Sequence, residues 1–135
     1  MLKSDIGESI LNATIDRGFI GLTYYNSGTR NMYTKKPVKK VEDLKGKKIR
    51  VQTSKTMVKM TELLGGSPSP LSFGEIYTAL QQGVVDGAEN NLISYSESKH
   101  YEVAPYFTFD EHSISPDVMI MNIKTWNKLT VKRKK

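Results

Sequence analysis

Short strand patterns alternate along this chain with helical patterns, and no other feature restricts the fold as strongly. Phe19–Tyr25 (FIGLTYY) is apolar and aromatic enough for a buried strand, and Lys48–Gln52 (KIRVQ) alternates apolar with polar residues. Asn26-Ser27-Gly28 predicts a turn, and Ser67–Leu71 is predicted to be extended, although its two prolines exclude a central strand over its whole length. Further short strands are predicted at 31–34, 84–85, 106–109 and 118–122. Helices between short strands favour a layered α/β domain over a β-sandwich or a helical bundle.

The predicted helices begin at polar caps and end at glycines. Ser54 precedes a helix whose apolar face ends at Gly65-Gly66. Ser72 and Glu75 have the spacing of a capping box, and the helix that follows them ends at Gly83. Further helices are predicted at 5–16, at 91–100 and from Thr125 onward.

The composition is that of one domain with a single core, because the chain has 135 residues and 38% of them are hydrophobic. No apolar run approaches the length of a membrane span, and no apolar signal-peptide core follows Met1. The absence of cysteine excludes disulfides, thiol catalysis and thiolate metal sites, and it is compatible with any cellular compartment.

The net charge of +6 first suggests nucleic acid or an anionic surface as a partner. The distribution weakens that suggestion, because Lys132–Lys135 supplies four of the positive charges. A second group of lysines surrounds Pro37 and Gly46 and is typical of solvated loops. Aromatic residues do not alternate with these lysines as they do in proteins that bind single strands. A basic interaction module therefore remains the alternative function, and no nucleic-acid partner is expected.

The sequence favours binding over catalysis. The two histidines, His100 and His112, lack the spacing of a metal-ligand motif, and the chain contains no nucleophile elbow or phosphate loop. Glu111 beside His112 suggests acid–base chemistry, but neighbouring residues of a strand point to opposite faces. A histidine at a strand end is more often a surface or supporting group than a catalytic one. No catalytic residue, metal or cofactor is therefore predicted.

Two arginines are candidates for binding an anion. Arg50 lies inside the apolar pattern Ile49-Arg50-Val51, where its guanidinium needs either solvent or a carboxylate partner. The alternative is the solvated face of an edge strand, and the pattern alone leaves both open. Arg30 follows the predicted turn at the end of a strand, where α/β sheets collect binding residues, although an arginine there is more often a surface charge than a ligand.

Two further residues have one structural and one functional interpretation. Phe73 lies in the first turn of a helix, where it is either a core contact or a wall for the apolar face of a ligand. Asn90 follows the predicted strand at 84–85 and offers an amide at a strand-to-helix turn, although asparagine is also a common turn former.

Three long segments together are more specific than any single residue. They are Lys48–Gln52 (KIRVQ), Leu64–Ser72 (LGGSPSPLS) and Phe73–Asn91 (FGEIYTALQQGVVDGAENN). Their sequence and order resemble the solute-binding proteins of tripartite ATP-independent periplasmic (TRAP) transporters. Tyr25–Arg30 (YNSGTR) and His100–Ala104 (HYEVA) lie at the distances expected for that family, so the resemblance covers nearly the whole chain.

The resemblance implies one lobe of a two-lobed, periplasmic-binding-protein-like α/β fold, with a mixed sheet flanked by helices. In this interpretation Arg50 forms the main salt bridge to a ligand carboxylate, because a planar guanidinium binds a carboxylate through two hydrogen bonds. Arg30, Asn90 and Phe73 are the other implied ligand-binding residues. Arg30 and Arg50 are expected to converge on one concave surface, and Arg50 is expected to be hydrated in the empty protein.

The resemblance also implies domain limits and a truncated receptor. Residues 19–130 are expected to form the ligand-binding lobe, 1–18 an N-terminal helix that remains from a preceding lobe or linker, and 131–135 a basic tail. Family members are much longer than this chain, which corresponds to one lobe without the bracing C-terminal helices. We expect apolar surface at the missing contacts and therefore some self-association.

Family members are extracytoplasmic receptors that deliver a small organic acid to the subunits of a sodium-coupled membrane permease. The resemblance therefore implies a periplasmic location for the full-length protein, although this chain has no signal peptide. The run Gly87–Asn91 with Ser94-Tyr95 and His100–Glu102 resembles receptors for sugar acids such as hexuronates. C4-dicarboxylates are the next ligand class to consider.

Overall fold

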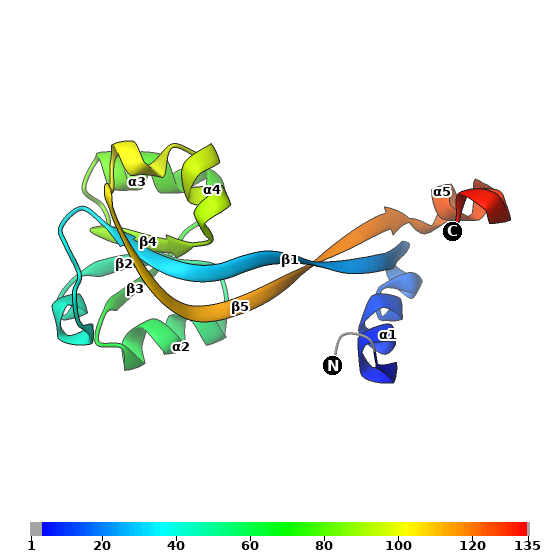
Figure 1. Ribbon diagram of the computed structural model, residues 1–135, viewed down its shortest axis with the longest axis horizontal. Helices are drawn as coiled ribbons and strands as arrows, with labels where there is room; N and C mark the ends of the chain where they lie inside the picture. The colour runs from blue at the N-terminus through cyan, green and yellow to red at the C-terminus, as the bar shows by residue number, and fades with distance from the viewer. Residues whose placement is uncertain (1–3, 135) are drawn as a thin grey trace. The chain divides into compact units, whose positions relative to one another are not determined.

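The computed structural model describes residues 4–134 and contains a five-stranded mixed sheet with the strand order β3-β2-β4-β1-β5 (Figure 1). The strands are β1 (Phe19–Thr34), β2 (Lys48–Val51), β3 (Ser67–Pro70), β4 (Gly87–Asn90) and β5 (Tyr106–Asn122). The α-helices are α1 (Asp5–Asn12), α2 (Lys55–Leu63), α3 (Ile76–Gln81), α4 (Leu92–Glu97) and α5 (Ile123–Lys128). Single turns of 3-10 helix are η1 (Ile15–Arg17), η2 (Val41–Leu44), η3 (Phe73–Glu75), η4 (His100–Glu102) and η5 (Val131–Arg133). The predicted α/β class with a mixed sheet and flanking helices is confirmed. No helix within residues 4–134 is long and apolar enough to cross a membrane.

The chain divides into two compact units, which we describe separately. The terminal unit contains the residues up to Ser27 and those from Ser115 onward, and the sheet unit contains Gly28–Ile114. The strands β1 and β5 contribute to both units. The limits at residues 19 and 130 for a ligand-binding lobe stay a prediction, and the ends of the two flanking segments, residues 1–3 and 135, lie outside the described residues.

In the terminal unit, the elements from the two ends of the chain are connected by hydrogen bonds. The hydroxyl of Tyr24 on β1 donates to the carbonyl of Gly7 on α1 at 2.7 Å. The backbone N–H of Ile123 donates to the carbonyl of Gly18 at 2.9 Å. The hydroxyl of Ser27 donates to the carboxylate of Asp117, so β1 and β5 are also joined through side chains.

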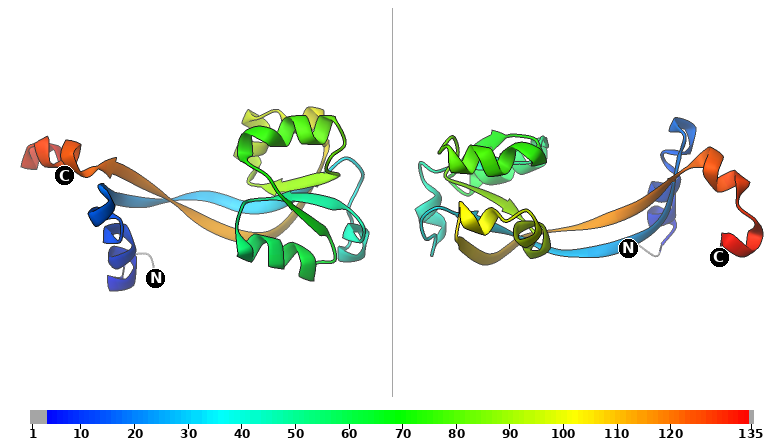
Figure 2. Two further views of the ribbon diagram at one scale, coloured as in Figure 1. Left: turned by 180° about the vertical axis from the view of Figure 1, so that it is seen from behind. Right: turned by 90° about the horizontal axis from the view of Figure 1, so that it is seen from above.

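In the sheet unit, α3 and α4 lie on one face of the sheet and α2 lies on the other (Figures 1 and 2). Each face carries one cluster of buried apolar residues. The α3–α4 face carries Tyr33 and Ala88, which pair across β1 and β4 and pack against buried residues of α3 and α4. The α2 face carries Met32 and Ile49, which pack against Met57 of α2. Because successive residues of a strand point to opposite faces, β1 contributes Met32 to one cluster and Tyr33 to the other.

Two long strands replace the shorter elements predicted at their positions. The segment Asn26-Ser27-Gly28 does not turn the chain, because β1 runs through it. Gly28 has a left-handed φ of 81°, which glycine adopts readily, and the strand continues past it. The two strands predicted at 106–109 and 118–122 are parts of the single strand β5. Pairing between long neighbouring strands overrides the local turn signal in both cases.

The strand predicted at Val84–Val85 is wrong, because the fourth strand is formed by the polar run Gly87–Asn90. All four of its residues are buried between β1 and β2, and this central position compensates for their low strand propensity. Gly87 is required there, because an added Cβ would lie 2.6 Å from the carbonyl oxygen of Tyr33.

Candidate functional site

The parallel strands β2, β3 and β4 end at one edge of the sheet, which we call the carboxyl edge. These strands end at Val51, Pro70 and Asn90. Because β1 is antiparallel to β4, Arg30 precedes the paired part of β1 at the same edge. Arg50 is the penultimate residue of β2. Open α/β sheets bind ligands at the carboxyl ends of their strands, and three of the four predicted residues lie on strands at this edge.

Arg50 is a buried residue of a central strand. β2 lies between β3 and β4, and Arg50 is only 3% exposed, so the edge-strand alternative and the expected hydration of the empty site are both wrong. Its side chain points to the α3–α4 face, because Arg50 pairs with Ala88. Burial lowers the pKa of Arg50, and the charge of Glu89 partly offsets this effect.

The guanidinium of Arg50 is held by a neutral group. Its Nε and Nη2 atoms both donate to the carbonyl oxygen of Leu71, at 2.9 Å and 2.7 Å. Within residues 4–134, no carboxylate lies within salt-bridge distance of this guanidinium. The carbonyl of Leu71 uses one side of the planar group, so the terminal N–H groups of Nη1 and Nη2 remain for a carboxylate that approaches end-on.

Arg30 is bound by a carboxylate. Its Nε atom lies 2.5 Å from Oε2 of Glu89, and its Nη2 atom donates to Oε1 at 2.9 Å and to the Glu89 carbonyl at 3.1 Å. Glu89 lies between Ala88 and Asn90 on β4, so this pair occupies the α2 face. The two predicted arginines therefore leave the sheet from opposite faces.

His112 extends the buried Arg30–Glu89 pair into a network that reaches Asp110 at the surface. Its Nδ1 atom lies 2.7 Å from Oδ2 of Asp110, and its Nε2 atom lies 3.6 Å from Oε2 of Glu89. Burial by itself would lower the pKa of His112, but hydrogen bonds and charges from Asp110 and Glu89 outweigh it and raise the pKa to about 9. The protonated imidazole is therefore the expected form at neutral pH.

The spacing of Asp110 and His112 in the sequence is compatible with this network, although no contact between them was predicted. Asp110 and His112 are two residues apart on β5, so their side chains share a face. Glu111 lies between them, and its carboxylate instead accepts from the hydroxyl of Thr29 at 3.3 Å. The pair Glu111 and His112, considered for acid–base chemistry, thus has two separate sets of contacts.

Asn90 and Phe73 occupy different positions at the carboxyl edge. Asn90 is 6% exposed, and its Oδ1 atom accepts from the backbone N–H of Asn91 at 2.9 Å, which directs the amide NH₂ to other partners.

Phe73 is 50% exposed at the start of η3. The predicted capping box holds this turn, because Glu75 accepts from the backbone N–H and the hydroxyl of Ser72. Arg50 and Asn90 share the α3–α4 face, and whether these side chains contact a ligand stays a prediction.

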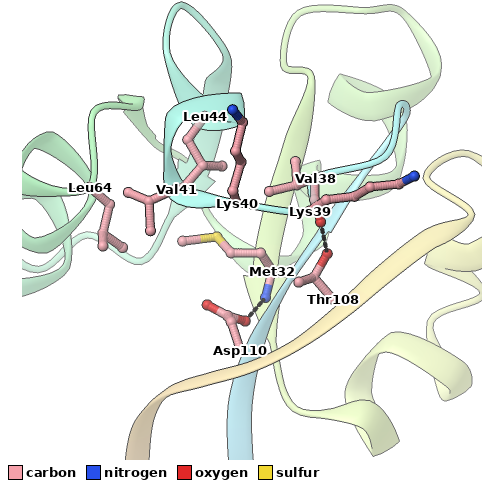
Figure 3. A pocket seen from close by; sticks show the side chains of 9 residues that line it. All are labelled: Met32, Val38, Lys39, Lys40, Val41, Leu44, Leu64, Thr108 and Asp110. Carbon is pink, nitrogen blue, oxygen red and sulfur yellow. Dashed lines mark hydrogen bonds between the residues drawn. The ribbon is translucent and has the colours of Figure 1, made fainter.

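An apolar hollow lies away from these residues. It has a volume of about 180 Å³ and lies on the α2 face, with Met32 in its wall (Figure 3). In its wall, Asp110 accepts from the backbone N–H of Met32 at 2.8 Å, and Thr108 donates to the carbonyl of Val38 at 3.0 Å. These polar groups are therefore already paired, and the hollow offers apolar surface for packing. Arg50 and Asn90 point to the opposite face.

The lysine-rich segment forms a second hollow at the opposite, amino edge of the sheet. Lys35, Lys36, Lys45 and Lys47 line it, and its volume is about 430 Å³. Its one carboxylate, Asp86, accepts from the backbone N–H of Lys48 at 2.8 Å. This hollow is where the alternative function, binding to an anionic surface, would act. In residues 4–134, no group of acidic residues and histidines has the arrangement of a metal site.

Comparison with known proteins gives one consistent family. The family model for bacterial extracellular solute-binding proteins, family 7, matches residues 1–135. The uncharacterized protein YiiZ of Salmonella typhimurium is 47% identical over 131 residues, which are 96% of this chain and 40% of that protein. This chain therefore spans less than half the length of that relative.

Solved structures agree with the family model. A TRAP periplasmic solute-binding protein from Bradyrhizobium, in complex with galacturonate, is 47% identical with a TM-score of 0.86, and the match covers 98% of this chain and 45% of that one. A TRAP periplasmic solute-binding protein from Anaerococcus prevotii, with bound glucuronate, is 46% identical with a TM-score of 0.85, over 96% of this chain and 42% of that one.

Proposed function

Because the chain belongs to family 7 of the bacterial extracellular solute-binding proteins, we propose that it forms one ligand-binding lobe of a receptor for a small organic acid. The observation that carries this proposal is the buried guanidinium of Arg50, which has a carbonyl and no carboxylate as its partner within residues 4–134. A buried cation without a counter-charge is costly, so an incoming carboxylate gains the full strength of the ion pair.

The geometry of Arg50 favours one direction of approach for the ligand. Leu71 holds the Nε side of the guanidinium, and the ligand carboxylate binds the terminal N–H groups. The amide NH₂ of Asn90 lies on the same face and donates to a hydroxyl or carboxylate oxygen. The exposed ring of Phe73 packs against an apolar face of the ligand.

The charges at the carboxyl edge favour a ligand with one carboxylate. Glu89 compensates the charge of Arg30, and Asp110 compensates the charge of protonated His112. Among the buried arginines and lysines of residues 4–134, Arg50 is then the one without an ion-pair partner. Arg30 lies on the α2 face with its charge compensated, so it adds no net charge to the face of Arg50. We therefore favour a hexuronate over a C4-dicarboxylate, in agreement with the ligands held by the two solved relatives.

In the full-length protein, this lobe would act with a second lobe that closes over the ligand. The relatives are more than twice as long as the matched region, which leaves room for such a lobe. The receptor would then deliver the acid to the permease subunits of a TRAP transporter in the periplasm. Both the permease partner and the location are proposals that rest on the family.

Isothermal titration of the full-length, two-lobed receptor tests the ligand class. We expect D-galacturonate or D-glucuronate to bind more tightly than succinate or malate by at least about tenfold, because a second carboxylate finds no second buried cation that lacks a counter-charge. Tighter binding of the C4-dicarboxylates would contradict the charge argument while leaving the receptor role intact. Binding of neither class, with retention on anionic vesicles through the lysine-rich hollow, would favour the alternative function.

A further inference from the structure

The buried residues Tyr33 and His100 form a pair next to the candidate site, and neither was predicted as a site residue. The hydroxyl oxygen of Tyr33 lies 2.8 Å from Nδ1 of His100. The imidazole ring lies between two aromatic rings, with its centroid 5.6 Å from that of Tyr33 and 6.0 Å from that of Phe73. Tyr33 points to the same face as Arg50, because both pair with Ala88. The pair therefore connects the core cluster of this face with the exposed ring at the carboxyl edge.

The hydrogen bond between the two residues determines which imidazole nitrogen carries the proton. Tyr33 is fully buried, and His100 Nδ1 is the partner of its hydroxyl within residues 4–134. A buried hydroxyl must donate its hydrogen, since an unpaired one costs free energy. Nδ1 is therefore the acceptor, and a neutral imidazole that accepts at Nδ1 carries its hydrogen at Nε2.

The surroundings of the pair favour this neutral form. Burial lowers the pKa of His100, and the charge of Arg50 lowers it further. Burial also raises the pKa of Tyr33, and this effect outweighs the opposing influence of Arg50, so the phenol keeps its proton. A protonated imidazole would place two hydrogens between the rings and leave the hydroxyl without an acceptor.

The Nε2 atom of His100 is open to the outside of the core. It has no hydrogen bond within residues 4–134. The buried polar side-chain atoms that lack a partner there are Thr61 Oγ1 and His112 Nε2, so Nε2 of His100 keeps some contact with solvent. The exposed fraction of His100 is 2%, close to the 3% of Arg50 and the 6% of Asn90. His100 thus presents one N–H group from an otherwise buried side chain, as Arg50 and Asn90 present polar groups from theirs.

We infer that the Nε2–H group of His100 donates a hydrogen bond to a hydroxyl oxygen of the bound sugar acid, and that Tyr33 is the positioning residue that fixes this tautomer. This inference rests on the proposed function. It explains how one lobe distinguishes a hydroxylated acid from an acid without hydroxyls. Arg50 binds the charged carboxylate, and His100 hydrogen-bonds a neutral hydroxyl oxygen. A site that hydrogen-bonds a hydroxyl rejects analogues without it, because its polar group is then left unpaired.

The tautomer is measured without a ligand, on this chain labelled with ¹⁵N at histidine. Long-range ¹H–¹⁵N correlation at neutral pH should show His100 with hydrogen on Nε2 and a free lone pair on Nδ1. Tyr33→Phe removes the donor, so a mixture of the two tautomers is expected. A His100 ring that carries hydrogen on Nδ1, or on both nitrogens, would overturn the inference.

The ligand contact is tested by NMR titration of the same chain with sodium D-galacturonate and with sodium propionate, which lacks hydroxyls. His100→Asn keeps an acceptor for the Tyr33 hydroxyl but removes the Nε2–H group. The dissociation constant for galacturonate should rise about three- to tenfold, the scale of one neutral hydrogen bond, and that for propionate should stay unchanged. Equal effects on both ligands, or none, would refute the role of His100.

Arg50→Lys separates this inference from the proposed function. It should weaken the binding of both galacturonate and propionate, because both ligands present a carboxylate. If Arg50→Lys changes neither ligand, the proposed carboxylate site is wrong. If it weakens both while His100→Asn leaves galacturonate unaffected, the proposed function stands and the inference about His100 fails.

Discussion

The two buried arginines of the sheet unit have similar burial and opposite chemical surroundings. Arg30, 7% exposed, meets the carboxylate of Glu89 on the α2 face. Arg50, 3% exposed, meets the carbonyl of Leu71 and points to the α3–α4 face. A carboxylate cancels the charge of a guanidinium, whereas a carbonyl fixes its orientation and leaves the charge in place. The partner, and not the degree of burial, thus separates a structural arginine from one that is ready to bind an anion.

The difference between the two faces also has energetic consequences. Removing one member of a buried ion pair leaves the other charge without a partner, which is strongly destabilising. The charge of Arg50 has no such partner in the empty protein, so its burial lowers stability until a carboxylate binds. A ligand that binds only the folded state then stabilises it according to its concentration. The α2 face should therefore respond to mutation through stability, and the α3–α4 face through ligand affinity.

Glu89→Gln should give the largest effect on stability. The amide keeps the shape of the carboxylate but leaves Arg30 without its counter-charge and removes one of the two carboxylates beside His112. We expect a loss of about 3–5 kcal/mol in the free energy of unfolding, measured by urea denaturation of this chain. The exposed pair Lys59 and Glu62 provides the control, because Glu62→Gln should change stability by less than about 0.5 kcal/mol. Equal effects of the two substitutions would show that the buried pair contributes no more than a surface pair.

The pH dependence of stability tests the same network through His112. Its pKa rises from 6.5 to about 9 on folding, so its contribution is fully present below pH 6.5 and is lost as the pH rises through about 9. Full deprotonation should cost about 3 kcal/mol, as expected from a shift of that size. Urea denaturation between pH 6 and 9.5 measures this change, and His112→Gln should flatten it. A wild-type stability that stays constant over this range would contradict a protonated His112 between Asp110 and Glu89.

Those two experiments concern a network that the sequence revealed only in part. Arg30, Glu89 and His112 are separated widely along the chain, and only the register of β1, β4 and β5 brings them together. The strand at Gly87–Asn90 also escaped prediction, since its small and polar residues lack strand propensity and only their central position explains the pairing. Non-local pairing of this kind leaves no periodic pattern in the sequence.

Other features were predictable because their causes are local. The capping box of Ser72 and Glu75 involves residues three positions apart, and the structure has both of its hydrogen bonds. The α/β class followed from the alternation of helical and strand patterns. Arg50 was identified as unusual from its apolar neighbours, but the sequence could not show whether solvent, a carboxylate or the carbonyl of Leu71 would meet it. The contact between Tyr33 of β1 and His100 of η4 joins residues far apart along the chain, so the sequence could not predict it either.

Arg50→Lys should have its main effect on ligand affinity. Lysine keeps the charge but loses the planar pair of N–H groups, so hexuronate binding by the full-length receptor should weaken by about 2–3 kcal/mol. Stability should fall by only about 1 kcal/mol, because the lost partner of the side chain is the neutral carbonyl of Leu71. Titration calorimetry and urea denaturation measure the two quantities. Arg30→Lys should reverse their order, and equal profiles for both variants would remove the distinction between the faces.

Phe73→Ala should give the smallest effects and refine the α3–α4 face. Because Phe73 is 50% exposed, its removal should change the free energy of unfolding by no more than about 0.5 kcal/mol. The ring covers an apolar face of the ligand in the proposed site, so hexuronate affinity of the full-length receptor should fall by about 1 kcal/mol. Val84, 53% exposed and outside the candidate site, provides a matched control in Val84→Ala, which should change neither quantity. If Phe73→Ala lowers stability more than affinity, the ring belongs to the core through its contact with His100, and the ligand site lacks this wall.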